Sequence, residues 1–439
     1  MQRILSDQLP RRAGHPVVLS GWIHRRRLLK SVAFLILRDR AGLAQVVVAE
    51  PEARAVLDRL GEETVVRVTG HVRENPAAPA GFEVVQPLIE PLSDPIGPLP
   101  VELHRPQLSA GLPTLLDHAP LALRHPGWRR VFEVSAVAVE GFRRALAGSG
   151  FTEIHTPKLV ASATESGADV FALDYFGTRA YLAQSPQLYK QMMVGVFERV
   201  FEVGPVFRAE PHDTSRHLAQ YTSLDAELGF IADHRDVMAV VHTAVGGMLS
   251  AASTVDTSEL PEAIGTPLGK AAPVAVPEAI PEVHFADAVR MVGAALGEDL
   301  TGEPDLAPAH ERWLGEWAAR EHGSEFLFVT GYPLAKRPFY THPEPGREGH
   351  TNSFDLLFRG VEVVTGGQRL HRYGDYAAAL TARGEPTAPY EPYLQAFRYG
   401  MPPHGGFAIG LERFVARLLG LPNVRQAALF PRDLHRLTP

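Results

Sequence analysis

A stretch near the middle of the chain alternates strictly between polar and apolar residues. From Tyr221 the sequence reads YTSLDAELGF, and its polar residues then share one face of a strand: Tyr221, Ser223, Asp225 and Glu227. An apolar run ends just before it at Phe207, and a charged loop joins the two. The pattern predicts an antiparallel hairpin with one buried face and one face that gathers a ring, a hydroxyl and two acids.

The end of the first strand and the loop add charged groups to the same hairpin. Arg208 and Glu210 share a face of the first strand, and Arg216 and His217 follow in the loop. Arginine binds phosphate or carboxylate in a bidentate way, and the ring of Tyr221 offers a flat surface to a purine. A surface hairpin with salt bridges would show the same alternation, so this pattern alone leaves both interpretations open.

A second hairpin places two carboxylates near each other. In FDLLFRGVEVV, Arg359 and Gly360 fit a two-residue turn, which sets Leu357 opposite Glu362. Asp355 lies two residues further on the same face, roughly 7–8 Å away along the diagonal. Mg²⁺ commonly takes one or two carboxylates together with substrate phosphates. The pattern favours a Mg²⁺ site, with a pair of exposed acids as the alternative.

A glycine-rich strand near the end of the chain runs directly into a helix, in the sequence HGGFAIGLER. Glycine within a strand often marks a close backbone approach to a ligand. Arg413 falls in the first turn of the helix, where the helix dipole favours anions and not cations. An arginine in this position points to a phosphate partner. The chain contains no GxxxxGK[ST] segment, so a P-loop is excluded.

Composition narrows the class of protein. The chain has 439 residues and no cysteine, which excludes disulfides and thiolate metal sites. It has no run of about 18 apolar residues, and its first residues lack the apolar core of a signal peptide. The expectation is therefore a cytoplasmic enzyme of two or three domains without a membrane span.

The first 90 residues read as a small β-barrel. Five short strand patterns fall between 16 and 87, with a helical pattern at 51–61 among them, and this order is typical of an OB-fold. Residues 1–50 carry nine Lys and Arg against three Asp and Glu, a balance that suits a nucleic-acid backbone. Phe34 and Gln45 lie in adjacent strands. Phe34 can stack on a base, although its spacing favours a core position.

The rest of the chain predicts a larger α+β domain. A proline-rich stretch follows the barrel, and the predicted division is a barrel at 1–102, a linker or hinge at 103–124 and a large domain at 125–439. Strands in hairpins with helices outside them indicate an antiparallel sheet flanked by helices. The segment 251–285 is rich in Ala and Pro, and we expect it to be a loose insertion.

Three segments resemble the motifs of one enzyme family, in the order that the family shows. FTEIHTPKL, FRAEPHDTSRHLAQYTSLDAE and GGFAIGLER look like motifs 1, 2 and 3 of the class II aminoacyl-tRNA synthetases. AQSPQLYKQ, GGQRLH and the ending LFPRDLHRLTP look like the aspartyl-tRNA synthetases of archaeal type. The resemblance covers the whole chain, and it implies an OB-fold anticodon-binding barrel beside a class II catalytic domain.

The resemblance implies an AMP-forming ligase that works in two steps. Aspartate attacks the α-phosphate of ATP, and the aspartyl-adenylate then passes its aspartyl group to the terminal adenosine of a tRNA. Catalysis would consist mostly of positioning and charge neutralisation, with Mg²⁺ beside the ATP. A homodimer is expected, because motif 1 lies at the dimer interface in this class.

The matching positions carry the family's roles residue by residue. The expected catalytic residues are Arg208 and Arg413. The expected ATP site consists of Arg208, Glu210, Arg216, His217, Tyr221, Glu362 and Arg413, and the expected Mg²⁺ ligands are Asp355 and Glu362. The expected aspartate site consists of Glu165, Ser185, Gln187, Lys190, Asp225 and Arg369. Lys190 and Arg369 should face the side-chain carboxylate, because two cations favour aspartate over neutral asparagine.

In the barrel, the resemblance implies anticodon contacts by His24, Phe34, Gln45 and Pro79. Members that charge only tRNA-Asp typically carry Trp and Lys at the positions of His24 and Pro79. The interpretation is a non-discriminating enzyme that charges both tRNA-Asp and tRNA-Asn, with the second product passed to a tRNA-dependent amidotransferase.

Three alternatives accompany this interpretation: a strictly tRNA-Asp-specific enzyme, an asparaginyl-tRNA synthetase, and a non-catalytic nucleic-acid-binding paralogue. Lys190 and Arg369 argue against the asparaginyl enzyme. The presence of Arg208, Arg413 and the carboxylate pair argues against a paralogue with a decayed site.

Overall fold

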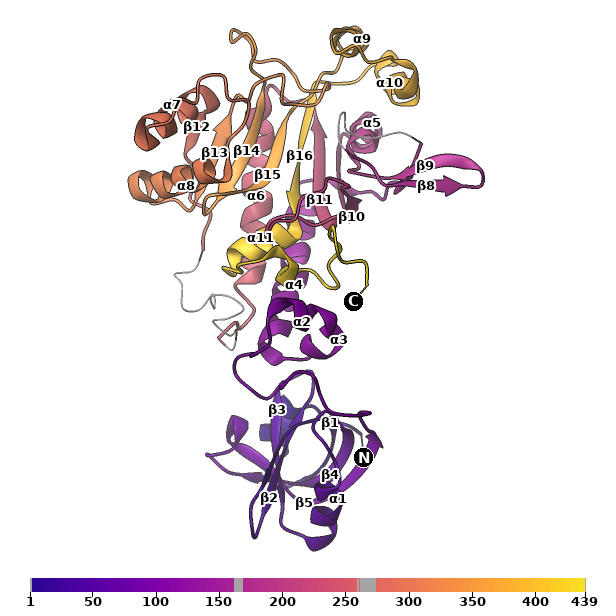
Figure 1. The fold of residues 1–439 in the computed structure, drawn as a ribbon, viewed down its shortest axis with the longest axis vertical. Helices are drawn as coiled ribbons and strands as arrows, with labels where there is room; N and C mark the ends of the chain where they lie inside the picture. The colour runs from indigo at the N-terminus through magenta and orange to yellow at the C-terminus, as the bar shows by residue number, and fades with distance from the viewer. Residues whose placement is uncertain (1, 162–168, 259, 261–273, 439) are drawn as a thin grey trace. The chain divides into compact units, whose positions relative to one another are not determined.

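The computed structural model describes residues 2–161, 169–258, 260 and 274–438. The chain divides into two compact units, Met1–Pro126 and Gly127–Pro439 (Figure 1). Among the described helices, none is both long enough and apolar enough to cross a membrane. Glu165, predicted to close over the amino acid, lies outside the described residues.

The first unit contains the predicted five-stranded barrel. It closes in the order β1-β2-β3-β5-β4, with β1 (Pro16–Leu28), β2 (Ala33–Arg38), β3 (Leu43–Val48), β4 (Val65–Glu74) and β5 (Phe82–Ser93). The helix α1 (Pro51–Asp58) joins β3 to β4, and the short 3-10 helices are η1 (Ser6–Arg12) and η2 (Pro79–Gly81). Alternate side chains such as Leu35, Leu37 and Val46 point inward and are fully buried. The OB-fold prediction is confirmed.

Two short helices, α2 (Leu112–Asp117) and α3 (Ala119–Ala122), occupy the segment predicted as a linker. The residue after them, Arg124, donates to Glu63 at 3.1 Å, and Glu63 also receives two hydrogen bonds from Arg38. These ion pairs attach the segment to the barrel within the first unit, which extends to Pro126.

The second unit is built on an eight-stranded sheet in the order β12-β13-β14-β15-β16-β11-β10-β6. Its strands are β6 (Thr152–Glu153), β10 (Arg199–Phe207), β11 (Gln220–Gly229), β12 (Glu282–His284), β13 (Phe326–Thr330), β14 (Ser353–Phe358), β15 (Val361–Gln368) and β16 (His404–Gly410). Neighbours pair antiparallel in the centre, and the two edge pairs, β12 with β13 and β10 with β6, are parallel. The predicted hairpins therefore lie in the antiparallel centre of the sheet.

Helices surround this sheet, as predicted. They are α4 (Pro126–Gly148), α5 (Gln187–Phe197), α6 (His234–Ala252), α7 (Phe285–Leu296), α8 (Pro308–His322), α9 (Tyr373–Ala382), α10 (Glu391–Arg398) and α11 (Leu411–Leu418), with η3 (Ala388–Tyr390) and η4 (Val424–Ala427). α6 packs on β15 and β16, and α5 packs on β10, β11 and β16. Asp233 caps α6 by accepting from Arg235 N at 2.6 Å, which satisfies one free N–H of its first turn.

A small second sheet, β7-β9-β8, consists of β7 (Leu159–Val160), β8 (Ala172–Tyr175) and β9 (Thr178–Leu182). Figure 1 shows the β8–β9 hairpin extending away from the main sheet. In the motif 1 segment FTEIHTPKL only Thr152 and Glu153 pair with β10. Beyond them, Thr156 and Lys158 bond to the side chain of Glu202.

The predicted insertion at 251–285 is described only in part, since 259 and 261–273 lie outside the described residues. Its first two residues complete α6, and its end forms β12, in which Val283 pairs with Val329 of β13. The end of this segment is therefore an edge strand of the main sheet and not a loose loop. The packing of Val283 in a buried cluster with Leu327 and Val329 explains the difference.

Candidate active site

A cavity of about 670 Å³ lies over the central strands of the second unit. Most of the predicted site residues line it: Gln187, Lys190, Arg208, Glu210, Arg216, His217, Tyr221, Glu362, Arg369 and Arg413. They come from α5, the β10–β11 hairpin, β15, the segment after it, and α11. Segments up to 226 residues apart in sequence, from Gln187 to Arg413, thus meet at one site, and each predicted hairpin gave only a part of it.

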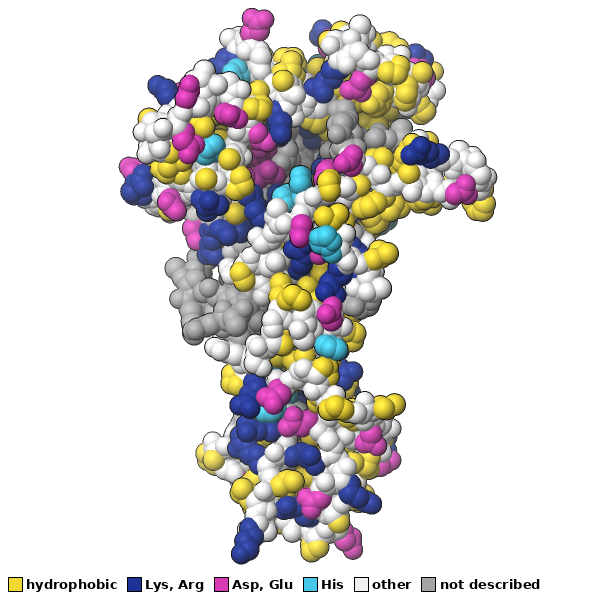
Figure 2. Space-filling view, in the orientation of Figure 1, with side chains coloured by type: hydrophobic (Ala, Val, Ile, Leu, Met, Phe, Trp, Pro, Cys, Tyr) yellow, Lys and Arg dark blue, Asp and Glu magenta, His cyan; other side chains and the backbone are white. Residues whose placement is uncertain are grey.

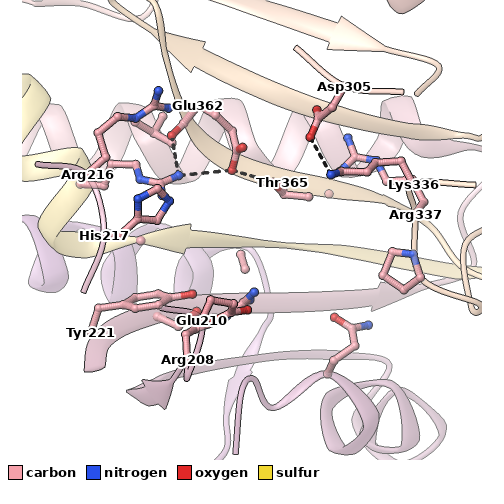
Figure 3. Close-up of a pocket in the computed structure, with 18 of the residues that line it drawn as sticks. Arg208, Glu210, Arg216, His217, Tyr221, Asp305, Lys336, Arg337, Glu362 and Thr365 are labelled. Atoms are coloured by element: carbon pink, nitrogen blue, oxygen red, sulfur yellow. Dashed lines mark hydrogen bonds and ion pairs between the residues drawn. The ribbon is translucent and has the colours of Figure 1, made fainter. Parts of the chain in front are cut away.

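The β10–β11 hairpin forms as the alternation predicts, with Val206 opposite Tyr221 and Phe207 opposite Gln220. β10 ends at Phe207, so Arg208 and Glu210 begin the loop and do not share a strand face as predicted. Arg208 N still bonds to Ala219 O at 2.8 Å, which holds the base of the loop. Figure 3 shows Arg208, Glu210 and Tyr221 together on one side of the cavity, across from Arg216, His217 and Glu362.

Both faces of β11 are covered, because it lies in the middle of the sheet. Ser223, Asp225 and Glu227 are buried, and Tyr221 is half-buried. The prediction that Phe230 belongs to the buried apolar face is wrong, since its side chain is 70% exposed. Phe230 follows the end of β11 with φ of 60°, a left-handed conformation that turns the chain out of the sheet.

We call a cluster of four charged side chains the closed end: Lys190 and Arg369 line the cavity, and they pair with Asp225 and Glu227, which are not among its lining residues. Lys190 Nζ donates to Asp225 Oδ1 at 2.9 Å and lies 3.4 Å from Glu227 Oε2. Arg369 Nε donates to Glu227 Oε1 at 3.0 Å. The exposed fractions of these side chains are 8% or less. Two buried cations and two buried anions therefore balance each other.

The electrostatics of the closed end depend on Glu227. Burial by itself would raise the pKa of Glu227, but Arg369 and Lys190 together bring that pKa below its ordinary value. The backbone of β16 approaches Glu227 closely. A Cβ atom on Gly406 would overlap Glu227 Oε2 and Ala226 O. The approach predicted for the glycines of β16 was to a ligand, whereas the close neighbours of Gly406 are a carboxylate and a carbonyl of this chain.

Gln187 and Ser185 lie beside the closed end. Gln187 N donates to Ser185 Oγ at 3.3 Å, and Arg369 Nη2 donates to Gln187 Oε1 at 3.5 Å. Gln187 Nε2 is buried and has no hydrogen-bond partner among the described residues. A buried donor without a partner is costly, so this amide is placed to bond an acceptor that enters the cavity. Ser185 is buried and is not among the residues that line the cavity.

The other part of the cavity, which we call the open end, carries Arg216, His217, Glu362 and Arg413. Arg413 Nη1 donates to Glu362 O at 3.1 Å, and Thr365 Oγ1 donates to Glu362 Oε1 at 3.0 Å. Burial, together with the nearby Arg413 guanidinium, lowers the pKa of His217 to about 4. His217 is therefore neutral near pH 7, and the positive charge here comes from the two arginines.

The predicted hairpin with two carboxylates forms, with the predicted turn and with the predicted first pair of residues. Arg359 and Gly360 both have positive φ, as a two-residue hairpin turn requires, and Leu357 pairs with Glu362. A bulge in the pairing after Leu357 then places Asp355 opposite Thr365.

The two carboxylates differ in exposure. The Glu362 side chain is 36% exposed and lines the cavity, whereas that of Asp355 is 5% exposed and accepts from Arg337 Nη2 at 2.8 Å. Burial raises the pKa of Asp355 to about 7; the guanidinium of Arg337 opposes this shift and the negative charge of Glu362 adds to it. Two hard oxygen donors that repel each other fit a divalent cation.

The comparison with known families agrees with this geometry. Residues 112–434 match the family described as tRNA synthetases class II (D, K and N), and residues 17–92 match the OB-fold nucleic acid binding domain. The chain belongs to the class II tRNA synthetases. The predicted ligase class is confirmed, and so is the predicted fold class, an OB-fold barrel together with a class II synthetase domain.

Two curated relatives and one solved structure place this synthetase more closely. The Aspartate--tRNA(Asp/Asn) ligase of Thermus thermophilus is 48% identical over 100% of both chains. The ligase of the same name from Deinococcus radiodurans is 45% identical over 100% of this chain and 99% of its own. The crystal structure of asparaginyl-tRNA synthetase from Pyrococcus horikoshii complexed with asparaginyl-adenylate matches with a TM-score of 0.91 at 31% identity, covering 100% of both chains.

Several residues of the synthetase site have no assigned role in the sequence interpretation. Glu227 is on the predicted polar face, so alternation gives its position, but only the structure shows its contact with Arg369. Glu311 of α8 accepts from Arg216, and Arg337 donates to Asp355. Glu412, in the first turn of α11, accepts from Thr222 N. No local pattern marks the last three, since each acts through a contact distant in sequence.

The barrel of this synthetase presents Phe34 and Gln45 on its outer surface. Their neighbours Leu35 and Val46 fill the core, whereas Phe34 and Gln45 are half-buried, so the core interpretation of Phe34 is wrong. Gln45 Nε2 donates to Glu83 at 3.0 Å. Phe34 pairs with Arg27 of β1, whose side chain is exposed. Figure 2 shows Lys and Arg side chains distributed over this barrel.

The other two predicted anticodon residues are placed differently. His24 is 8% exposed, and Arg38 Nη1 donates to its Nδ1 at 3.2 Å. Burial, together with the charge of Arg38, lowers the pKa of His24 to about 4. Pro79 begins η2 and is half-buried. The structure thus puts His24 under the barrel surface, where it contacts a buried arginine.

Proposed function

We propose that this synthetase attaches L-aspartate to tRNA-Asp and to tRNA-Asn by way of aspartyl-adenylate. The observation that carries the proposal is the closed end, where Lys190 and Arg369 are buried and share Glu227. Aspartate brings one ammonium and two carboxylates. Its α-carboxylate reacts with ATP, so the ammonium and the side-chain carboxylate add one charge of each sign to a balanced cluster. The ammonium suits Asp225, and the carboxylate suits the two cations and the unpartnered Gln187 Nε2.

This balance also supports selection against asparagine. Its side-chain amide would leave Lys190 and Arg369 without the anion that offsets the ammonium beside Asp225. An uncompensated buried charge is costly, and a site built on polar pairing rejects a substrate that cannot complete it. Asn-specific structural neighbours share the fold, so the selection rests on these side chains and not on the architecture.

The open end supports the nucleotide roles. A substrate carboxylate oxygen attacks the α-phosphorus, and the bond to the pyrophosphate oxygen breaks. Arg208 is placed beside Tyr221, where its guanidinium would neutralise charge on the α-phosphate while the ring stacks on adenine. Arg413 and Arg216 would meet the outer phosphates. In the second step a terminal hydroxyl of the tRNA attacks the acyl carbon, and AMP leaves.

The class binds ATP together with a divalent metal, and we propose Mg²⁺ for this chain. Asp355 and Glu362 would hold it, because both offer oxygen ligands and the charge of Glu362 raises the pKa of Asp355. When bound, Mg²⁺ would neutralise phosphate charge. Arg337 forms an ion pair with Asp355 in this structure, so Mg²⁺ would compete with Arg337 for the Asp355 carboxylate.

Two features support charging of both tRNAs. The relatives from Thermus thermophilus and Deinococcus radiodurans are both named for Asp and Asn tRNAs. His24 and Pro79 are the residues predicted for the non-discriminating type. Since His24 is buried against Arg38, we expect it to act on the shape of the barrel surface and not by touching a base. The Asp-tRNA-Asn product would then need an amidation step by a tRNA-dependent amidotransferase.

The deciding experiment is aspartylation of purified tRNA-Asp and tRNA-Asn transcripts, with asparagine as the control amino acid. Comparable charging of both tRNAs with aspartate supports the proposal. Charging of tRNA-Asp alone would leave the aspartyl activity and remove the non-discriminating part. Attachment of asparagine would show that Lys190 and Arg369 do not have the proposed role.

We also propose a homodimer. Large apolar side chains are exposed near the β10–β11 pair: Val196, Phe197 and Phe230 are 62%, 45% and 70% exposed. Gly229 N bonds to Glu198 O at 2.8 Å, which brings the end of α5 and the end of β11 together at one end of the β10–β11 pair. At this end β10 also pairs with β6 of motif 1. Such a patch is typical of an interface. Sedimentation should show a dimer, and Phe230→Asp should shift the protein toward the monomer.

A further inference from the structure

One arginine of the motif 2 loop, the segment between β10 and β11, is held by a helix outside the three motifs. Arg216 Nη2 donates to Glu311 Oε2 of α8 at 2.7 Å. The Glu311 side chain is 9% exposed, and that of Arg216 is 25% exposed where it lines the cavity. A nearly buried carboxylate thus binds one edge of a guanidinium whose other edge is close to the cavity.

The same oxygen of Glu311 has a second donor. Glu362 N donates to Glu311 Oε2 at 3.0 Å. This carboxylate therefore joins the motif 2 loop to the start of β15, which carries one of the two proposed metal ligands. A charged acceptor shared by a guanidinium and a backbone N–H is held from two directions, which limits its rotamers.

Packing of the helix fixes the position of Glu311. α8 crosses the Arg359–Gly360 turn so closely that a Cβ on Gly315 would overlap the backbone of Gly360. A Cβ on Gly360 would lie 2.8 Å from Arg312 Cα and 3.2 Å from Glu311 O. Leu314 of the same helix is fully buried. Two glycines in contact leave the helix no room to slide, so Glu311 is placed by the core and not by a surface loop.

The loop is also held on its other side. Arg425 of η4 donates from Nη2 to Asp213 Oδ1 at 3.0 Å and from Nη1 to Thr214 O at 2.9 Å. Val424 N donates to Ser215 O at 2.9 Å. The backbone just before Arg216 is therefore fixed, and the freedom that remains is that of the Arg216 side chain.

We propose that Glu311 is a positioning residue that orients the Arg216 guanidinium toward the phosphate end of the cavity without touching the nucleotide itself. This inference rests on the proposed function, in which Arg216 meets the outer phosphates of ATP. Guanidinium offers five N–H donors, so the bond to Glu311 leaves donors for a phosphate. Without Glu311 the side chain regains its rotamers, and ATP binding must order it again.

The test compares Glu311→Gln with Glu316→Gln, a matched change at an exposed position of the same helix. The readout is aspartate-dependent ATP–pyrophosphate exchange. We expect Glu311→Gln to raise the KM for ATP about tenfold, the scale of one lost charge-assisted hydrogen bond, with the KM for aspartate unchanged. Glu316→Gln should behave as the wild type. If Glu311 had a purely structural role, Glu311→Gln would lower kcat, and it would lower kcat/KM for ATP and kcat/KM for aspartate together.

A double-mutant cycle separates positioning from other effects. Arg216→Gln should itself raise the KM for ATP, and adding Glu311→Gln to it should change that KM less than twofold, because the residue to be positioned is already gone. Multiplicative effects, or a normal KM for ATP in Glu311→Gln, would overturn the proposal.

Two further results are interpretable. If the thermal melt shows that Glu311→Gln does not fold, two other variants decide. A normal KM for ATP in Arg216→Gln overturns the proposal. A normal KM for ATP in Glu311→Asp overturns it as well, because the proposal requires this variant to raise that KM. Absence of aspartate-dependent exchange in the wild type would contradict the proposed function instead. In that case direct titration with ATP still compares Glu311→Gln and Glu316→Gln, and equal affinities overturn the role of Glu311.

Discussion

At the closed end of the cavity the charged side chains are 8% exposed or less, whereas at the open end Arg216, Arg413 and Glu362 keep between 25% and 36% of their side chains exposed. The closed end lies on strands and α5, and its charges bond to one another. The open end takes Arg216 and His217 from a loop. Under the proposed function, selection of the amino acid is built into the folded core, while the nucleotide is bound by side chains that are more exposed to solvent.

The largest expected effect separates the two ends directly. Arg369→Gln removes a buried cation from Glu227 and should cost about 3–5 kcal/mol of unfolding free energy, since it leaves a buried anion with one partner. Aspartate-dependent exchange should fall on the order of 10³-fold. Arg413→Gln is the matched change at the open end, and should lower activity with a stability loss of less than about 1 kcal/mol. Urea unfolding of both variants tests this, and equal stability losses would remove the distinction.

Two glutamates sharpen the comparison through pH: Glu227, which is fully buried, and Glu412, which is half-buried and lines the cavity. Cations lower the pKa of Glu227 at the closed end, whereas burial raises the pKa of Glu412, which accepts from Thr222 N below the open end, to about 7. A raised pKa means that the folded state holds the proton more tightly than the unfolded chain. The stability from Glu412 is then present below about pH 4.5 and is lost as pH rises through 7.

Glu412→Gln should therefore make the free energy of unfolding less dependent on pH. Between pH 5 and pH 8 the wild type should lose about 2 kcal/mol more unfolding free energy than the variant. Glu227→Gln should change the acid side instead, because a lowered pKa contributes stability that is lost as pH falls. Unfolding curves at pH 5 and pH 8 measure the effect of Glu412, and curves below about pH 4.5 measure that of Glu227. A Glu412→Gln curve parallel to the wild type would contradict the assignment.

A smaller effect is expected for the proposed metal pair. Glu362→Gln keeps the side-chain size but removes the more exposed of the two carboxylates. The Mg²⁺ concentration for half-maximal exchange should rise about tenfold, and the unfolding free energy should change by less than about 1 kcal/mol. Titration of Mg²⁺ after chelator treatment measures the first quantity. An unchanged requirement would mean that the metal, if used, is held elsewhere.

The smallest effect is expected at His217. Its pKa of about 4 keeps the ring neutral near pH 7, so His217→Gln should change kcat less than about threefold at saturating ATP. Because the lowered pKa favours the neutral folded state, the wild type should also lose stability as pH falls from about 6.5 toward 4. The variant should show a shallower loss. A pH–rate inflection near 6.5 that disappears in His217→Gln would contradict a neutral ring.

The elements of the site could be predicted where the pattern is local. The alternation from Tyr221 to Leu228 gives β11 and its polar face, and Arg359–Gly360 gives the hairpin turn, because both depend only on near neighbours. Phe34 was assigned to the core because AFLIL is apolar at every position, which conceals the period of two. Closure of the barrel decides which residues face inward.

The contacts of the site could not be predicted in the same way. Glu227 bonds to Arg369, 142 residues further along the chain, and Arg216 bonds to Glu311, 95 residues further. Each bond depends on the packing of elements that no local period describes. The resemblance to known synthetases gave Lys190, Arg369 and the arginines of motifs 2 and 3, but not Glu227 and Glu311, the acids that bond to Arg369 and Arg216.

The approach of β16 to Glu227 has a consequence for the sequences that can encode this site. Any side chain at position 406, even a single methyl group, would occupy the space of the Glu227 carboxylate and of a carbonyl on β11. A library that randomises codon 406 should therefore return glycine alone from a selection for aspartylation. Under the proposed function, the aspartate site therefore requires glycine at position 406, where no conservative substitution exists.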